Sequence, residues 1–298
     1  MSRLFSRWLP LTLLALLALL ALAGCRREVV APGDPVAAVK GLAHAVRDND
    51  LVRYSRLSMP PALHRQMEAR WKANLATAPA PTLAQQQDYA KWMGRLTAPD
   101  AQAQLYRSFD RKLKKIEEEL NSQWPLMQAT GSIFLNGVIS ANPKLTAAEK
   151  AHAKAMGSTL INWLKPELVT DRDRARRAIA ALTETARDIN LPTLADSRRL
   201  EMIPAMEKAG RGLKGLKQIG RIYDLDADAS LSQVQARVKA VDGPVATMEV
   251  SYPLLGKTVK FEMQLLRRDG RWYSADAVRN AEQALTQPPG TAQAGSAP

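Results

Sequence analysis

The fold is decided by residues 232–273, SQVQARVKAVDGPVATMEVSYPLLGKTVKFEMQLLRRDGRWY, where apolar and polar residues alternate. A period of two is typical of a strand that buries one face. The alternation is broken at residues that favour tight turns, namely Asp242-Gly243, Gly256 and Asp269-Gly270. The sequence therefore predicts a meander of four antiparallel strands, closed by a helix over residues 276–285, with Trp272 at the buried end of the last strand.

Upstream of the strands, residues 34–222 carry apolar residues at intervals of three and four, which is typical of helices that bury one face. Residues that can cap a first helical turn mark the expected helix starts: Asp34, Asp50, Thr82, Asp100, Thr146, Thr170 and Asp196. Pro125 is expected to kink or end the longest helix, and Pro204 to kink a later one. The predicted class is α+β, with a helical region over residues 34–222 and a sheet plus helix over residues 223–286.

Residues 126–139 form a mostly apolar stretch that contains Gly131 and Gly137. The stretch is too short to cross a membrane as a helix, which takes about 20 apolar residues. We therefore expect it in the central core. The last twelve residues, 287–298, are rich in Gln, Pro, Gly and Ala, and we expect a disordered tail.

The first 25 residues have the layout of an export signal. Arg3 and Arg7 precede a run without charge, and the run ends in Leu22-Ala23-Gly24-Cys25, which holds the single cysteine of the chain. This ending resembles the lipobox of bacterial lipoproteins. The resemblance implies that residues 1–24 are removed and that Cys25 carries a diacylglyceryl group at the start of a tether over residues 25–33. A membrane-spanning helix and a buried cysteine behind an ordinary signal are the alternatives.

The same resemblance implies a location. In Gram-negative lipoproteins an Asp after the lipidated cysteine favours the inner membrane, and this chain has Arg26 there. The implied place is the inner leaflet of the outer membrane, with the body in the periplasm. Because lipidation uses the single cysteine, the mature chain has no thiol left for a disulfide.

A second resemblance covers both ends of the mature chain. Residues 34–58, and residues 232–286 with their Asp269-Gly270-Arg271-Trp272-Tyr273 motif, resemble nuclear transport factor 2-like lipoprotein domains. The resemblance implies a cone-shaped sheet with a pocket, and the helices between about residues 60 and 222 would then be an insertion. That family includes both enzymes and inert binders, so the resemblance assigns no catalytic residue.

The chain is strongly basic, with 42 Lys and Arg against 29 Asp and Glu, which gives +13. Loss of Arg3 and Arg7 with the signal leaves +11. Such a charge suits anionic lipid, peptidoglycan or an acidic protein, whereas nucleic acid is not expected in the envelope. The candidate anion-binding residues recur every three or four positions: Lys208, Arg211, Lys214, Lys217 and Arg221. Two alternatives to anion binding are open. The positive charge is distributed over every face and serves solubility, or this segment is an edge helix that packs its leucines on the sheet and keeps its cations in water. Because glycines weaken this helix, it could order only on docking.

Reactive motifs are scarce. His44, His64 and His152 stand far apart without the spacing of metal ligands, so no metal is expected. Residues 210–215 match Gly-x-Gly-x-x-Gly, but no strand precedes them, so no cofactor is expected. We predict a membrane-anchored envelope lipoprotein with a non-catalytic binding or accessory role. The alternatives are an assembly subunit, which would expose a large apolar patch, and a cell-wall hydrolase, which would hold a carboxylate of raised pKa in a pocket.

Overall fold

The computed structural model describes residues 29–143 and 145–288. Within it, the described residues from Ala31 onward form one compact unit. The predicted signal peptide, Cys25, the first part of the tether and residues 289–298 of the predicted tail lie outside the described residues. The helical region and the sheet, which the sequence treats as separate segments, belong to the same unit.

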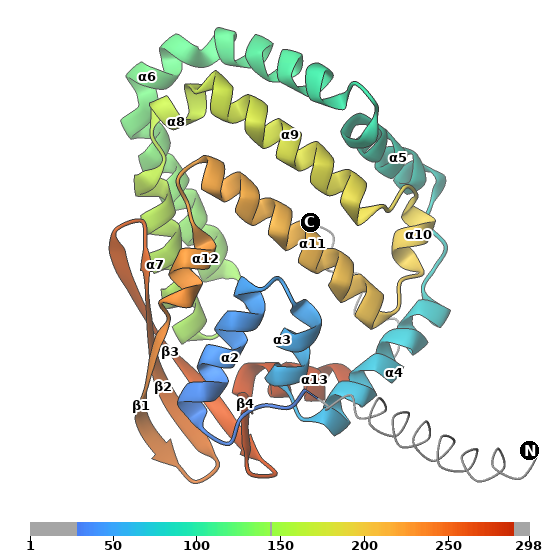
Figure 1. Ribbon diagram of the computed structural model, residues 1–298, viewed down its shortest axis with the longest axis vertical. Coiled ribbons are helices and arrows are strands. Elements are labelled where there is room, and N and C mark those ends of the chain that lie inside the picture. Colours follow the sequence, from blue (N-terminus) through green and yellow to red (C-terminus); the bar gives the residue numbers. More distant parts are fainter. Residues whose placement is uncertain (1–28, 144, 289–298) are drawn as a thin grey trace, which may run out of the picture. The chain divides into compact units, whose positions relative to one another are not determined.

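Helices fill most of the described chain, and the sheet follows them (Figure 1). In chain order the elements are α2 (Pro35–Arg47), α3 (Leu51–Ser58), α4 (Pro61–Thr77), α5 (Leu83–Thr97), α6 (Ala101–Ala141), α7 (Ala147–Trp163), α8 (Pro166–Thr170), α9 (Arg172–Ile189), α10 (Leu194–Arg198), α11 (Met202–Ile222), α12 (Ala227–Ser232), β1 (Gln235–Asp242), β2 (Val245–Leu254), β3 (Lys257–Arg268), β4 (Arg271–Ser274) and α13 (Ala275–Thr286).

The predicted α+β class is confirmed. The four strands pair antiparallel in the order β1-β2-β3-β4, and α13 follows directly. Two-residue turns at Leu255-Gly256 and Asp269-Gly270 join the last three strands, and all four of these residues have positive φ. Such turns match the twist of paired strands.

The sheet has a core on each face. On one face Trp272 packs with Met248, Val250 and Leu265 against α2. On the other face Tyr273 packs with residues of α4 and α13, including Val278. The neighbours Trp272 and Tyr273 thus serve different cores, because successive side chains of a strand point to opposite faces.

The edge strand β1 differs from expectation. The alternation from Val234 to Ala240 predicts a buried face, but only Val234 is buried and Val238 is exposed. A bulge between Val238 and Ala240 shifts the register against β2. Such irregularity is common at sheet edges, where one side of the strand has no partner.

Most predicted helix starts are confirmed by capping bonds. Asp34, Asp50, Thr82 and Thr146 each accept a hydrogen bond from the backbone of the first turn. Three predictions are wrong in detail. Thr193 rather than Asp196 caps α10, and α10 ends at Arg198, before α11 begins. Asp171 rather than Thr170 caps α9. Pro204 makes no kink, because α11 begins at Met202 and the proline lies in its first turn, where a missing N–H removes no helical bond.

Helix α6 continues through Pro125, so the proline does not end it. Figure 1 shows α6 running along the top and then turning down the left side, next to α7. The expectation that residues 126–139 form the central core is wrong. Leu126, Met127, Ile133, Phe134 and Val138 are exposed. Within residues 126–139 only Ile139 is buried, because α7 covers one side of this segment and the other side faces solvent.

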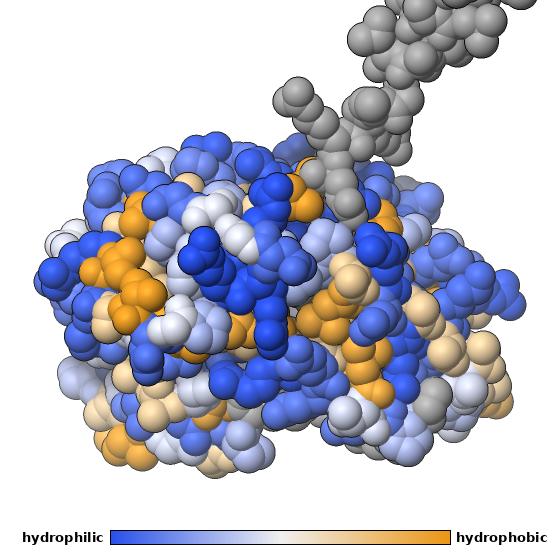
Figure 2. All heavy atoms as spheres, turned by 90° about the horizontal axis from the view of Figure 1, so that it is seen from below, coloured by the Kyte–Doolittle hydropathy of each residue, from blue (hydrophilic) through white to orange (hydrophobic). Residues whose placement is uncertain are grey.

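Helices α6, α9 and α11 lie side by side in a layer, with α7 packed between the end of α6 and β3. Seen from below, hydrophobic residues form separate patches among hydrophilic ones (Figure 2). Across residues 29–143 and 145–288, no helix combines the length and the apolar character that crossing a membrane requires.

Candidate functional site

Helix α11 carries the predicted basic residues and is held by close contacts through its glycines. A Cβ at Gly215 would collide with the side chain of Thr185 on α9, and a Cβ at Gly210 would collide with the carbonyl oxygen of Asn49. The Gly-x-Gly-x-x-Gly match is therefore a packing motif inside a helix. Despite the intrinsic cost of its glycines, α11 is helical, and it packs within the same chain on α9 and α3. It does not pack on the sheet.

The predicted anion-binding face is not continuous. Lys217 is only 5% exposed, and its Nζ lies 2.6 Å from the carbonyl oxygen of Val46, 2.9 Å from that of Arg47 and 2.7 Å from Asp228 Oδ1. A buried ammonium needs such partners. The structure thus corrects the assignment of Lys217, because its charge joins α11 to α2 and α12 instead of facing a ligand.

Two further candidates also bind backbone. Lys208 donates to the carbonyl oxygens of Ile189 and Asn190 at the end of α9, and Arg211 donates to that of Asp188 at 2.9 Å. Cations there complement the partial negative charge of a helix C-terminus. Lys214 and Arg221 are exposed, and the structure records no partner for them among the described residues. Lys214 and Arg221 are thus the candidates without a recorded partner, and Arg211 is exposed but has partners at the end of α9.

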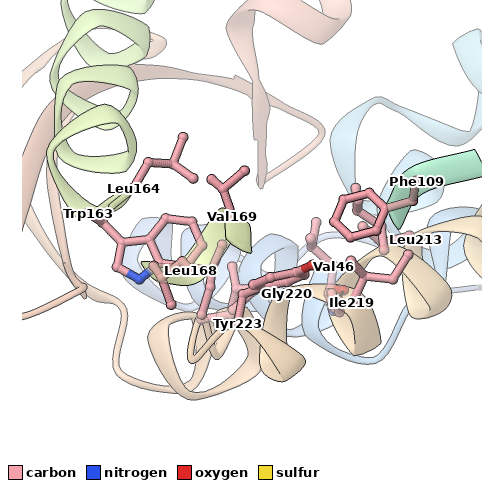
Figure 3. A pocket seen from close by; sticks show the side chains of 15 residues that line it. Val46, Phe109, Trp163, Leu164, Leu168, Val169, Leu213, Ile219, Gly220 and Tyr223 are labelled. Atoms are coloured by element: carbon pink, nitrogen blue, oxygen red, sulfur yellow. Dashed lines mark hydrogen bonds between the residues drawn. The ribbon is translucent and has the colours of Figure 1, made fainter. Parts of the chain in front are cut away.

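The helical layer encloses an apolar groove of about 600 Å³. Figure 3 shows Phe109 and Leu213 at one end, and Trp163, Leu164 and Leu168 at the other. Leu216, which is mostly exposed, also lines it. Its lining comes from α2, α6, α7, α8, α11 and α12, and from the segments that join them. We call this hollow the groove.

A second hollow, of about 450 Å³, lies between the sheet and helices α2, α7 and α12. We call it the inner cavity. Val46, Ala227 and Leu231 line both hollows, so the two adjoin at α2 and α12. Both volumes fall within the range of about 300–1,000 Å³ that is typical of small-molecule sites.

A polar recess of about 620 Å³ adjoins the inner cavity at its other side, where the two share Tyr54, His152, Phe261 and Met263. Its charged lining consists of Glu149, Glu262, Asp276 and Arg279. The three hollows therefore form a series, with the charged groups at the end formed by the recess.

His152 stands where the inner cavity meets the recess. Its ring stacks on Phe261 with centroids 4.0 Å apart, and its Nε2 is hydrogen-bonded to Tyr252 Oη at 2.8 Å. Burial lowers the pKa of His152 and raises the pKa of Tyr252, so both rings are neutral near pH 7. The inner cavity thus meets the recess at a polar pair without charge.

Ion pairs fix the helices that border the groove. Arg172 at the start of α9 binds Glu117 in a bidentate pair, at 3.0 and 2.8 Å, and Asp110 at 3.0 Å. Arg174 joins α9 to the end of α11 through Asp224 at 2.6 Å. Bidentate pairs fix geometry as well as distance. The carboxylate of Glu117 therefore holds α6 to α9.

A hydrolytic or metal site would show among the described residues as a carboxyl group of raised pKa or as a cluster of metal-binding side chains. Within residues 29–143 and 145–288, each carboxyl group with a resolved shift has its pKa lowered, and the causes include nearby hydrogen-bond donors and cations, as at Asp110 and Glu249. The same part of the chain holds no group of three or more His, Cys, Asp or Glu side chains placed to bind a metal ion. His44, His64 and His152 lie on three different helices, α2, α4 and α7.

Sequence reasoning missed the groove and assigned no residue to the lining of either hollow, although the second resemblance implied a pocket beside the sheet. Their lining residues, such as Trp163, Leu168 and Tyr223, are distant in the chain, and their apolar periodicity is the same as that of core residues. No protein-family model matches the sequence, and searches of curated proteins and of solved structures find no match either.

Proposed function

We propose that this chain is a lipid-anchored envelope protein that binds an apolar or amphipathic small molecule without transforming it. The observation that carries the proposal is the series of two adjoining apolar hollows, the groove and the inner cavity, followed by the polar recess. Small-molecule sites combine an apolar lining with a few polar groups that fix orientation.

The chemistry of the lining favours an uncharged chain in the two apolar hollows. Lys217 borders the groove, but its ammonium is held by Val46, Arg47 and Asp228. His152 and Tyr252 bind each other at the far side of the inner cavity. A charged group placed in these hollows would lose its hydration without gaining a partner. The recess, with Arg279 and its carboxylates, suits the polar end of an amphiphile.

A fluorescent apolar probe tests the proposal. N-phenyl-1-naphthylamine should bind the mature chain with Cys25 changed to Ser, and Ala227→Trp should reduce binding, because the new ring would fill the point where the groove and the inner cavity adjoin. Ala229→Trp is the matched control on the same helix, since Ala229 is exposed and lines neither hollow. Equal binding by both variants would contradict the site.

A series of saturated fatty acids tests the chemical class. Each methylene that enters an apolar site contributes about 0.8 kcal/mol, so affinity should rise about fourfold per added methylene until the hollows are filled. Competition against the naphthylamine probe measures this. An affinity that does not depend on chain length would exclude an acyl-type ligand.

The location is part of the proposal and rests on the lipobox-like ending at Cys25. We expect Cys25→Ser to leave an uncut or soluble species, since no thioether to diacylglyceryl can form. Fractionation and labelling with a radioactive fatty acid measure this. Unchanged labelling of the variant would refute the lipid anchor, and the naphthylamine test would still decide the site.

An anionic envelope partner remains a second proposal, with Lys214 and Arg221 as its candidates. It is supported by the net charge of +11 that the mature chain carries after Arg3 and Arg7 are removed from the +13 of the whole chain. The cell-wall hydrolase gains no such support, because the shifted carboxyl groups of the described chain have lowered pKa values.

A further inference from the structure

The second half of α6, residues 121–141, exposes a large apolar surface. Residues 120–143 contain no charged side chain. Five large apolar residues in this half are exposed: Leu126 at 66%, Met127 at 47%, Ile133 at 74%, Phe134 at 73% and Val138 at 53%. We call this segment the uncharged half of α6. Exposed apolar residues that share one helix face mark interaction sites.

The opposite face of the uncharged half is occupied by α7. Leu135 fills the space above Gly157, and Gln128 Nε2 donates to the carbonyl oxygens of Ile161 and Leu164 at 2.9 and 3.0 Å. Ile139 is buried. The helix is therefore held in place from behind, and its apolar face is presented by a fixed support.

The exposed face alternates large and small residues. Beyond its large residues it carries Thr130 and Gly137, and a Cβ added at Gly137 would meet no atom within 4 Å. If two such helices run antiparallel with the twofold axis at the height of residue 132, residue 127 faces 137 and residue 134 faces 130. This register sets Met127 against Gly137 and Phe134 against Thr130, twice each because a twofold contact repeats every pair.

We infer that the exposed face of the uncharged half of α6 is the contact between two copies of this chain, paired antiparallel about a twofold axis that crosses this face at the height of residue 132. Large residues of each copy then fill the spaces above small residues of the other. Close packing of this kind is the property of helix interfaces that gives them a defined register.

Charge also favours a second copy. The mature chain carries +11, so two copies repel each other wherever cations meet. The uncharged half is a face where two copies meet without like charges. An anionic membrane, in contrast, would be matched by a basic face, and this face has no cation of its own.

The dimer is expected to be reversible. A helix segment of 21 residues is about 30 Å long, and a contact confined to it lies at the small end of specific interfaces, which bury about 1,200–2,000 Å² in total. The fold does not depend on it, since the exposed residues take no part in the two cores of the sheet.

Sedimentation velocity over a dilution series tests the contact, with the mature chain carrying Cys25→Ser. We expect a monomer–dimer equilibrium, and Phe134→Glu should raise the dissociation constant at least about tenfold, because a carboxylate would be buried unpaired. Trp92→Glu on α5 makes the same charge change at an exposed aromatic residue and should leave the equilibrium unchanged.

A swap of residues tests the register. Gly137→Leu should weaken the dimer, because it meets Met127 of the other copy, and Met127→Ala combined with Gly137→Leu should restore it. A chain that stays monomeric at the highest concentrations, or a dimer unaffected by Phe134→Glu, would overturn the inference. So would a monomer that binds phosphatidylglycerol vesicles through Phe134, since the face would then serve a membrane. Failure of the swap alone would overturn the register.

Discussion

At the scale of single residues, the ammonium of Lys217 is the clearest example of a charge whose role depends on its surroundings. Three oxygens hold it, two from the end of α2 and one from Asp228 on α12. Its neighbour Lys214, three residues earlier on the same helix, is exposed. Two lysines of one periodic pattern are therefore expected to differ in role: the folded chain should depend on the charge of Lys217, and it should not depend on the charge of Lys214.

We expect Lys217→Met to destabilise the chain by about 3 kcal/mol, the lower end of the range for breaking a buried ion pair, because Asp228 keeps some exposure to solvent. Lys214→Met should change stability by less than about 0.5 kcal/mol. Urea unfolding followed by circular dichroism measures both. Similar small effects would show that the Lys217 ammonium can reach water.

His152 makes the stability depend on pH. Burial holds its folded pKa below the ordinary value of about 6.5, so the unfolded chain binds this proton more readily. Its contribution is complete above pH 6.5 and is lost as the pH falls below that value. His152→Gln keeps a partner for Tyr252 but does not titrate, so its unfolding free energy should fall less between pH 7.5 and pH 5. Parallel losses in both proteins would assign the dependence to other groups.

Trp272 tests the core beneath α2. It is buried on the sheet face that packs against Ala38 and Val39. Truncating a buried aromatic residue typically costs about 3–5 kcal/mol, and we expect Trp272→Ala to lose that much. Trp92→Ala, at an exposed site, serves as the comparison and should lose little. A melting temperature of Trp272→Ala within a degree or two of the parent would contradict this packing.

At the scale of elements, the packing of α11 on α9 depends on Gly215. The side chain of Thr185 occupies the position where a Cβ would stand, so Gly215→Ala should destabilise the chain by about 1–3 kcal/mol through overpacking. Gly94→Ala on α5 has open space and should stabilise by about 0.5–1 kcal/mol, since alanine favours helix. Thermal unfolding compares the two. If Gly215→Ala were stabilising, Thr185 would not occupy the position of the new Cβ, and α11 and α9 would be farther apart than in this structure.

The helices and strands also show which features of the fold the sequence can predict. Turn pairs such as Asp269-Gly270 and caps such as Asp34 act within four residues, so the meander and most helix starts were predictable. Burial depends on what lies opposite in space. Phe134 and Leu113 belong to the same helix and have similar apolar character, yet one is exposed and the other buried. The groove escaped prediction for the same reason, because residues from six helices form it.

At the scale of the whole molecule, the question is whether the net charge of the chain, +13, acts through one basic face or is distributed over the whole surface. If the basic face of α11 binds anionic lipid, changing both Lys214 and Arg221 to Gln should weaken association with phosphatidylglycerol vesicles. Changing both Lys91 and Arg95 on α5 to Gln is the control and should weaken it less, although each double variant removes two exposed cations. Association of the parent should fall with salt, because screening shortens to about 8 Å at 0.15 M. Flotation assays measure this. Equal losses in the two variants would favour a spread charge.

The bonds between β4 and the beginning of the described chain bear on how the protein folds. Trp272 donates its backbone N–H to the carbonyl oxygen of Pro32 at 3.0 Å, and Arg271 donates to that of Ala31 at 2.9 Å. These partners are separated by about 240 positions, so α2 meets its sheet only after nearly the whole polypeptide has been delivered. Contacts of such long range slow folding. A chain exported with its amino end first would therefore keep the face of α2 that packs on the sheet uncovered until the strands arrive, a period in which a holding chaperone would protect it from aggregation.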